Sequence, residues 1–238
     1  MYENSSMRVY NSIILLSLLL IVLVTYFSFR SINREPYIPF TRDGDYSVQE
    51  IPDFLTSEEC DRVIGLAGPN LFTSKVYTSD SDLEDKNVRI SDQCWIKDSD
   101  DEFIAHLSRR ISEITGTDIK SQEELQVVRY KPGGFYKPHF DACNKETDDC
   151  TRLNNGLGPR FITFIIYLND GFDGGETFFP QINTKVVPKR GKAVVFYNVD
   201  DEGEILPKSL HGGLDVKNGE KWMCNKWIRL SHLADKSA

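Results

Sequence analysis

Two histidines and an aspartate carry the clearest chemical signal in this sequence. His139 and Asp141 are separated by one residue, and His211 follows far downstream. In an extended strand alternate side chains point to the same face, so His139 and Asp141 can project together. With His211 from a distant strand they make a two-histidine, one-carboxylate metal site, the ligand set of non-haem Fe(II) oxygenases. Lys221 could then hold the far carboxylate of a bidentate acid bound to the iron.

The spacing of His139 and Asp141 is not specific by itself, because the same tripeptide pattern also occurs in exposed strands. The second half of the chain predicts the strands that a metal site would need. Short apolar runs alternate there with turns rich in glycine, aspartate, asparagine and proline, which indicates a sandwich or barrel. We expect strands over residues 125–130, 135–141, 160–168, 176–179, 184–187, 192–197, 204–211 and 221–230.

The first half of the chain predicts two helices that pack outside these strands. One helix begins near Thr56, which is followed by acidic residues, and ends at Gly68-Pro69. The other spans residues 98–115, with Ser99 or Asp100 as its cap and an apolar stripe on one face. The fold class is therefore α+β, mainly β, with flanking helices.

Residues 78–87 are dense in aspartate and serine and have no apolar period. They are expected to form a loop, which is either a plain solvated connection or a mobile flap over a site. A short strand is expected to follow over residues 88–96.

Length and charge limit the classes of protein to which this chain can belong. A chain of 238 residues is long enough for one domain with a full core. Its formal net charge is -8, and its pI is about 5.1. Nucleic-acid-binding proteins usually carry a basic patch, so no nucleic-acid partner is expected.

The N-terminal segment predicts a membrane anchor. Residues 13–29 form a nearly continuous apolar run without charge, which is long enough for a spanning helix. The alternative is a cleaved signal peptide, although its apolar region is usually shorter. We therefore expect an anchor with a short tail over residues 1–30, a stalk over 31–48 and a catalytic domain over 49–238. This organisation predicts a single-pass membrane protein.

The chain has five cysteines, so at least one is unpaired in any intramolecular scheme. Cys143 and Cys150 bracket a short polar loop. They could form a disulfide in an oxidising compartment, or both could be free thiols.

From Ile51 to Leu230 the chain resembles the catalytic domain of prolyl 4-hydroxylases, especially the small plant, algal and viral type. Several ordered blocks carry the resemblance, and together they are more specific than any single motif. The matching stretches are residues 53–60, 125–130, 136–141, 174–180, 191–196, 209–213, 219–222 and 225–227. The resemblance implies a double-stranded β-helix, a jelly-roll variant.

The resemblance also implies a reaction. Fe(II) and 2-oxoglutarate bind, and oxidative decarboxylation by O2 gives succinate and CO2 while proline is hydroxylated at C4. The substrate is expected to be a proline-rich or collagen-like peptide, and L-ascorbate is expected to keep the iron reduced. The anchor, together with the habit of the family, places the catalytic domain in the endoplasmic reticulum or secretory lumen. The catalytic domain is expected to be monomeric.

Residue by residue, the resemblance assigns three groups. His139, Asp141 and His211 would bind the iron. Lys221 would pair with the far carboxylate of 2-oxoglutarate, with Tyr130 and Thr177 in the same pocket. The substrate-side positions are Tyr136, Arg160 and Trp227, with Arg89 and Ser91 beside the expected flap. The alternatives are ordinary strand positions for Tyr130 and Thr177 and core packing for Trp227.

The chain departs from the family pattern at two places. Arg229 stands where the family often has a histidine, which puts the peptide preference in doubt. Leu214-Asp215 stands where many members have Cys-Pro, which removes a potential disulfide partner for Cys224. Two other functions therefore remain as alternatives: an oxygenase acting on another residue or a small molecule, and a non-catalytic jelly-roll binding module.

Overall fold

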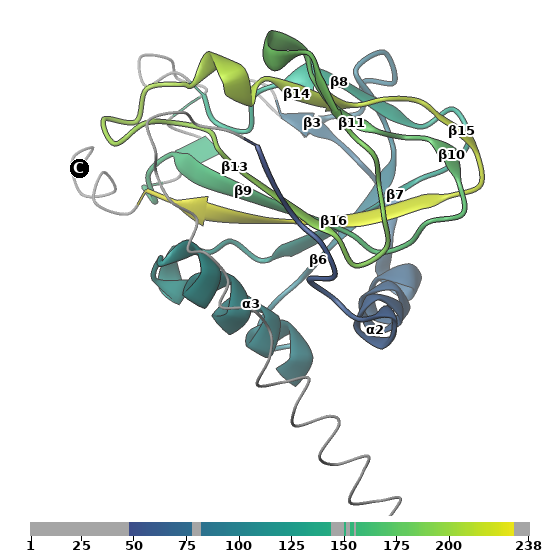
Figure 1. Ribbon diagram of the computed structural model, residues 1–238, viewed down its shortest axis with the longest axis horizontal. Helices are drawn as coiled ribbons and strands as arrows, with labels where there is room; N and C mark the ends of the chain where they lie inside the picture. Colours follow the sequence, from purple (N-terminus) through teal and green to yellow (C-terminus); the bar gives the residue numbers. More distant parts are fainter. Residues whose placement is uncertain (1–47, 78–81, 144–149, 151–152, 155, 231–238) are drawn as a thin grey trace, which may run out of the picture. The chain divides into compact units, whose positions relative to one another are not determined.

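The computed structural model describes residues 48–77, 82–143, 150, 153–154 and 156–230, all within one compact unit. They form two antiparallel sheets that face each other, with the two main helices against the outer side of the larger sheet (Figure 1). This mainly β architecture with flanking helices confirms the predicted fold class.

The larger sheet has the strand order β1-β13-β9-β16-β7-β6-β2. Long antiparallel ladders join its central strands, so β9 and β16 are paired on both edges. Its strands are β1 (Gln49–Ile51), β2 (Phe72–Thr73), β6 (Asp92–Ile96), β7 (Leu125–Tyr130), β9 (Arg160–Tyr167), β13 (Ala193–Tyr197) and β16 (Lys221–Arg229).

The smaller sheet has the strand order β12-β11-β14-β8-β5, and two short hairpins accompany the two sheets. Its strands are β5 (Arg89–Ile90), β8 (Phe135–His139), β11 (Thr177–Phe179), β12 (Thr184–Val186) and β14 (His211–Gly213). The hairpins pair β3 (Val76–Tyr77) with β4 (Asp82–Leu83) and β10 (Asp173–Gly174) with β15 (Val216–Asn218).

Strand β16 shows how the alternation of side chains separates the two sides of the larger sheet. Lys221, Met223 and Trp227 face the smaller sheet, where they line a cavity. Cys224 and Ile228, on the other face, are fully buried. Beside this cavity, one apolar cluster packs between the sheets: Val128, Tyr130, Ile165, Tyr167, Phe179, Val186, Val194, Phe196, Val216 and Met223.

Helix α2 (Ser57–Ala67) begins with a capping box, in which Thr56 and Glu59 satisfy each other's backbone N–H groups. Helix α3 (Glu102–Thr115) begins later than predicted. Its N-cap is Asp101, whose carboxylate accepts from the Phe103 N–H, because Asp100 is engaged with the Lys97 N–H instead. The αL conformation of Gly116 ends α3 as predicted.

Four expected elements differ in the structure. The strand expected over residues 88–96 is divided into β5 and β6, which belong to different sheets. The strand predicted over 204–211 is a 3-10 turn, Pro207–Ser209, followed by β14, because proline lacks the N–H that a strand ladder needs. Part of the loop expected over 78–87 is strand β4. Strand β8 ends at His139, so Asp141 follows the strand instead of lying in it.

The predicted membrane localisation is corrected here. Among the described residues, no helix combines the length and apolar character that crossing a membrane requires. This finding contradicts the expected single-pass protein with a lumenal catalytic domain. The apolar run 13–29, on which that expectation depended, lies outside the described residues, as does the stalk up to residue 47.

The structure decides between the two alternatives for the cysteines. Cys143 and Cys150 form a disulfide, and Cys60, Cys94 and Cys224 are buried free thiols. Burial raises the pKa of Cys60 and of Cys94 to about 11, so both stay protonated at neutral pH.

We expect Gly191→Ala to destabilise the fold more than Gly171→Ala. Both glycines have positive φ, 78° and 82°, so alanine adds strain of about 1–2 kcal/mol at either position. At Gly191 a Cβ atom would also collide with the Leu55 carbonyl oxygen, whereas Gly171 has open space. Urea unfolding should therefore show a loss at least about 2 kcal/mol larger for Gly191→Ala. Equal losses would contradict this account of the close approach.

Candidate functional site

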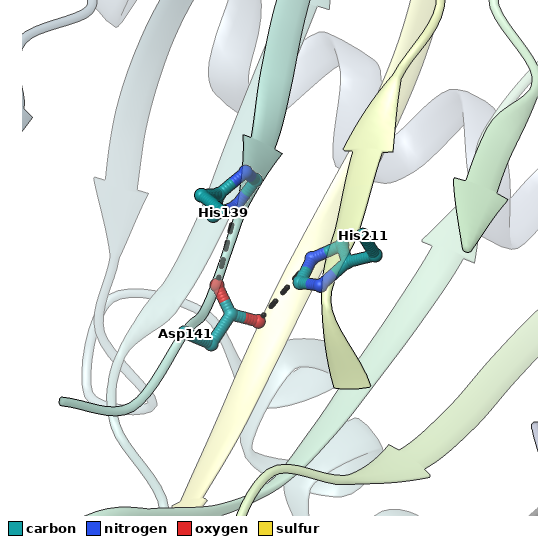
Figure 2. Close-up of side chains that lie close together, drawn as sticks. All are labelled: His139, Asp141 and His211. Carbon is teal, nitrogen blue, oxygen red and sulfur yellow. Dashed lines mark ion pairs between the residues drawn. The ribbon is translucent and has the colours of Figure 1, made fainter. Parts of the chain in front are cut away.

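The three predicted metal ligands converge between the sheets (Figure 2). His139 at the end of β8 is paired in register with His211 at the start of β14. Asp141 follows two residues after His139, and its two carboxylate oxygens lie 3.5 Å from His139 Nε2 and 3.6 Å from His211 Nε2. One ligand atom from each residue lies within 4.8 Å of the others. The backbone pairing therefore brings together residues 72 positions apart in the chain.

Backbone carbonyls fix both imidazole rings. His139 Nδ1 donates to the Lys137 carbonyl oxygen at 2.9 Å, and His211 Nδ1 donates to the Ser209 carbonyl oxygen at 2.8 Å. A carbonyl oxygen only accepts, so the proton of each neutral ring is on Nδ1. Both Nε2 atoms consequently present a lone pair toward Asp141, which is the arrangement of metal-binding histidines.

The Asp141 carboxylate is held by two donors on one oxygen. Thr163 Oγ1 donates to Asp141 Oδ2 at 2.6 Å, and Trp227 Nε1 donates to the same oxygen at 3.0 Å. Thr163 in turn accepts from Asn198 Nδ2 at 2.7 Å. Both donors occupy Oδ2, so Oδ1 is the oxygen left for a metal ion.

Electrostatics keep Asp141 ionised and His211 neutral. Burial acts to raise the pKa of Asp141, but His211 and His139 outweigh it and hold that pKa far below its ordinary value. Burial, aided by His139, lowers the pKa of His211 to about 4. At neutral pH the site therefore combines one carboxylate with neutral imidazole, a donor set that fits divalent iron.

The metal-ligand cluster opens onto a cavity of about 450 Å³ between the sheets. Lys221 is 1% exposed at the start of β16, and its Nζ donates to the Gly175 carbonyl oxygen at 2.7 Å. The Nζ atom also lies 5.3 Å and 5.4 Å from the ring centroids of Tyr130 and Tyr167. Within the described part of the chain, Lys221 forms no salt bridge.

Burial lowers the pKa of Lys221 to about 7, because the ammonium loses its hydration and Glu176 compensates only in part. A carboxylate ligand in the cavity would provide the missing countercharge. Tyr130 and Thr177, the other residues predicted for the co-substrate, line the same cavity. The structure therefore brings the predicted metal ligands and co-substrate residues into one space.

The predicted peptide-side residues divide into two groups. Tyr136 stacks on the His139 ring at 3.6 Å, and the Arg89 guanidinium lies 4.8 Å from the Tyr136 ring; both residues line the cavity. Ser91 accepts from Arg89 Nε at 2.8 Å but is not part of the cavity wall. Ser91 thus orients Arg89, which contacts the cavity directly.

Arg160 and Trp227 also line the cavity, and they pack on each other with the guanidinium 3.6 Å from the ring centroid. Arg160 makes two parallel hydrogen bonds to Glu123, at 2.7 and 2.8 Å. Arg229, the departure from the family pattern, lies 2.7 Å from the same carboxylate. It donates to the carbonyl oxygens of Gly158 and Leu153 and is not part of the cavity wall.

Sequence reasoning missed a row of amide side chains on the cavity wall. Gln126 donates to Gln93 at 2.9 Å, and Asn225 donates to Gln126 at 2.9 Å, so the row crosses β6, β7 and β16. Gln126 and Asn225 are polar residues inside otherwise apolar strands, which is the signal that could have identified them. Thr163 and Tyr167 were missed as well, because they lie within a strand that reads as apolar core.

Comparisons with known proteins agree with this geometry. Residues 125–229 match the model of the 2OG-Fe(II) oxygenase superfamily. The chain is 35% identical to a putative prolyl 4-hydroxylase of Acanthamoeba polyphaga mimivirus, over 74% of this chain and 72% of that protein. It is 34% identical to the chicken (Gallus gallus) prolyl 4-hydroxylase subunit alpha-1, over 82% of this chain but only 39% of that subunit.

Among solved structures, the viral collagen prolyl hydroxylase of Paramecium bursaria Chlorella virus-1, in a 2-oxoglutarate complex, aligns with a TM-score of 0.62 and 32% identity. The alignment covers 78% of this chain and 97% of that structure. This similarity confirms the predicted jelly-roll core. Because the chain spans about two fifths of the vertebrate subunit, it corresponds to one part of that longer protein.

We expect Thr163→Val to weaken metal binding. The change removes one of the two donors to Asp141 Oδ2 and leaves the Asn198 amide without its acceptor. The affinity for Fe(II), measured by anaerobic titration calorimetry, should fall by about 10–100-fold. Thr184→Val, whose lost hydroxyl donates to the Ile182 carbonyl oxygen and not to a metal ligand, should leave this affinity unchanged. Equal affinities in both variants would contradict the role of Thr163.

We expect Lys221→Met to stabilise the ligand-free protein. Folding lowers the pKa of Lys221 from 10.5 to about 7, so between these values the unfolded chain binds more protons and stability rises with pH. The free-energy cost of burying the charged Lys221 side chain is therefore largest near and below pH 7. At these pH values the change to methionine should add about 2–4 kcal/mol to the free energy of unfolding.

Urea unfolding of the wild type and Lys221→Met at pH 7 and pH 10 checks this, with Lys217→Met at an exposed position of β15 as the control. The advantage of Lys221→Met should shrink at pH 10. A difference that does not depend on pH would exclude a buried charge as its cause.

Proposed function

The chain belongs to the prolyl 4-hydroxylase group of the 2OG-Fe(II) oxygenase superfamily, and we propose that it hydroxylates proline residues of peptides at ring carbon 4. One observation carries this proposal: a single cavity contains the His139, Asp141 and His211 cluster and the buried side chain of Lys221, which forms no salt bridge with any residue that the structure describes. Such a cavity suits a metal ion and a dicarboxylate bound side by side. The catalytic domain would comprise residues 49–238.

His139 Nε2, His211 Nε2 and Asp141 would hold the iron. When bound, Fe(II) with 2-oxoglutarate and O2 supplies the oxidising power that replaces a proline C–H bond with C–OH and releases succinate and CO2. L-ascorbate would act as the external reductant that keeps the metal in the ferrous state. The protein supplies three preorganised ligands and the open side of the cavity.

Lys221 would orient the co-substrate by pairing with its far carboxylate. Burial makes this pairing strong, because the ammonium of Lys221 has lost its hydration and gains a countercharge when an anion binds. Tyr130 and Thr177 would add hydroxyl donors to the same carboxylate. These contacts fix the distance of the co-substrate from His139 and His211, which positions the reacting groups.

The peptide would occupy the part of the cavity lined by aromatic rings and cations. Tyr136 and Trp227 present flat surfaces that suit a proline ring in an extended polyproline II chain. Arg160 and Arg89 flank these rings, and Glu123 fixes the orientation of Arg160. Proline-rich or collagen-like peptides are therefore the proposed substrates.

Coupled turnover of the full chain tests the proposal. The protein is incubated with Fe(II), ascorbate, 2-oxoglutarate and one of three peptides: polyproline, Pro-Pro-Gly repeats or a proline-free peptide. We expect succinate in amounts equal to peptide that gains one oxygen atom on proline, measured by mass spectrometry. Succinate formation without peptide oxidation would mean that the acceptor is another molecule.

We expect His211→Ala to reduce this turnover by at least about 10³-fold, because a metal site that loses one of three protein ligands cannot hold the reacting groups in place. His106→Ala, at an exposed position of α3, is the matched control and should retain full activity. Activity retained by His211→Ala would refute the ligand assignment.

A further inference from the structure

The row of amide side chains on the cavity wall ends in a donor that the protein does not use. Asn225 Nδ2 donates to Gln126 Oε1, and Gln126 Nε2 donates to Gln93 Oε1, each at 2.9 Å. The row therefore has a direction, and Gln93 is its last member. Gln93 is 8% exposed and lines the cavity, and its amide nitrogen has no hydrogen-bond partner among the residues that the structure describes.

Counting donors and acceptors shows which ligand atom this end of the row suits. An amide NH2 group has two N–H donors. The row uses one donor of Asn225, one of Gln126 and none of Gln93, while the Gln93 oxygen already accepts from Gln126. Buried amide nitrogens normally donate to an acceptor. Gln93 therefore suits a ligand that brings a hydrogen-bond acceptor into the cavity.

Two aromatic rings flank Gln93 on the same face of the larger sheet. Phe72 of β2 is its direct partner in the ladder, and Trp95 follows two residues later on β6. Both rings line the cavity, although they are 48% and 36% exposed. The Trp95 ring lies 5.8 Å from the ring of Trp227, so the aromatic surface continues to β16.

This combination of exposed rings and an unused donor matches the chemistry of a proline-rich peptide. Proline has no backbone N–H, so the main chain of such a peptide presents mainly carbonyl acceptors. A polyproline II chain makes no internal hydrogen bonds, which leaves these carbonyls available to a protein donor. Grooves that bind such chains are lined by aromatic rings. Phe72 and Trp95 provide the rings, and Gln93 provides the donor between them.

The strand order places Gln93 at a distance from the reacting centre. Asp141 is held by Thr163 of β9 and Trp227 of β16, so the metal-ligand cluster lies against these two strands. Gln93 is on β6, two strands beyond β16. Neighbouring strands lie about 4.8 Å apart, so this separation is about 10 Å. A polyproline II chain rises about 3.1 Å per residue and covers that distance in about three residues.

From this geometry we propose that Gln93 is a peptide-binding residue, whose amide donates to a main-chain carbonyl oxygen about three residues from the proline that is hydroxylated. The inference rests on the proposed function and deepens it, because it adds a second point of contact for the peptide. Gln126 and Asn225 would orient the Gln93 amide through the row. The chain would therefore favour peptides long enough to reach from the metal-ligand cluster to β6.

Steady-state kinetics of the full chain with decaproline and triproline test this. Gln93→Met removes the amide with little change in side-chain length. We expect it to raise the KM for decaproline by about 3–10-fold, the range of one net hydrogen bond, and to leave kcat unchanged. Triproline extends at most about 6 Å beyond a target residue and cannot reach Gln93, so its kcat/KM should not change.

A second variant separates the lost donor from a broken amide row. The carboxylate of Gln93→Glu still accepts from Gln126 but has no N–H, so at pH 8 the KM for decaproline should rise at least as much as in Gln93→Met. Gln181→Glu adds the same charge at an exposed position outside the cavity wall and should leave this KM unchanged. The KM for 2-oxoglutarate should stay unchanged in all three variants.

Three results would overturn the inference. They are an unchanged KM for decaproline in Gln93→Glu, equal losses of kcat/KM for decaproline and triproline, and an equal rise in the KM for 2-oxoglutarate. The failures of the two proposals are distinguishable. A wild type that hydroxylates neither peptide overturns the proposed function, and this inference with it. A wild type that hydroxylates decaproline with the same KM as Gln93→Met overturns the role of Gln93 alone.

Discussion

The structure depends on one buried carboxylate. Asp141 keeps its charge away from water because a threonine hydroxyl and an indole N–H donate to one of its oxygens, while two imidazole rings lie beside the carboxylate with Nε2 at 3.5 and 3.6 Å. These partners come from β8, β14, β9 and β16, so the two sheets must face each other at one distance and in one register. The requirement that a buried charge be satisfied thus fixes the geometry on which the metal site depends.

Lys221 is also buried at this cavity, but its charge is not balanced as that of Asp141 is. Within the described residues, its ammonium has a carbonyl oxygen and two aromatic rings as neighbours but no anion in a salt bridge. Burial of such a group destabilises the folded protein, and an anionic ligand would relieve that loss. Under the proposed function, a charge that destabilises the free protein would therefore become a source of affinity and orientation for a dicarboxylate. Stability and function are in conflict at this residue.

A second layer of side chains connects the metal-ligand cluster to the edge of the cavity. Trp227 contacts both Asp141 and Arg160, and Glu123 joins Arg160 to Arg229. Arg229 in turn holds two carbonyl oxygens of the segment after the disulfide-bonded Cys150. In this chain, the residue that replaces the usual histidine is therefore part of the support of the cavity wall.

The sequence by itself determined the local elements and the identity of the chemical groups. The capping residues of α2 and the apolar runs of β7, β9 and β16 identify these elements, since periodicity and capping depend on near neighbours. The ordered motifs predicted the metal ligands and the role of Lys221, and they indicated the family. The sequence did not identify the strand break at Pro207 or the hairpin of β3 and β4, because each is decided by long-range pairing.

Tertiary structure alone decided which side chains share a cavity. Thr163 and Tyr167 lie in a strand that reads as uniform core, and only their position opposite Asp141 and Thr177 makes them part of the site. The disulfide between Cys143 and Cys150 and the altered pKa of Lys221 likewise depend on three-dimensional proximity and burial. The physical reason is that hydrogen bonds and desolvation act over a few ångströms in space, whatever the separation along the chain.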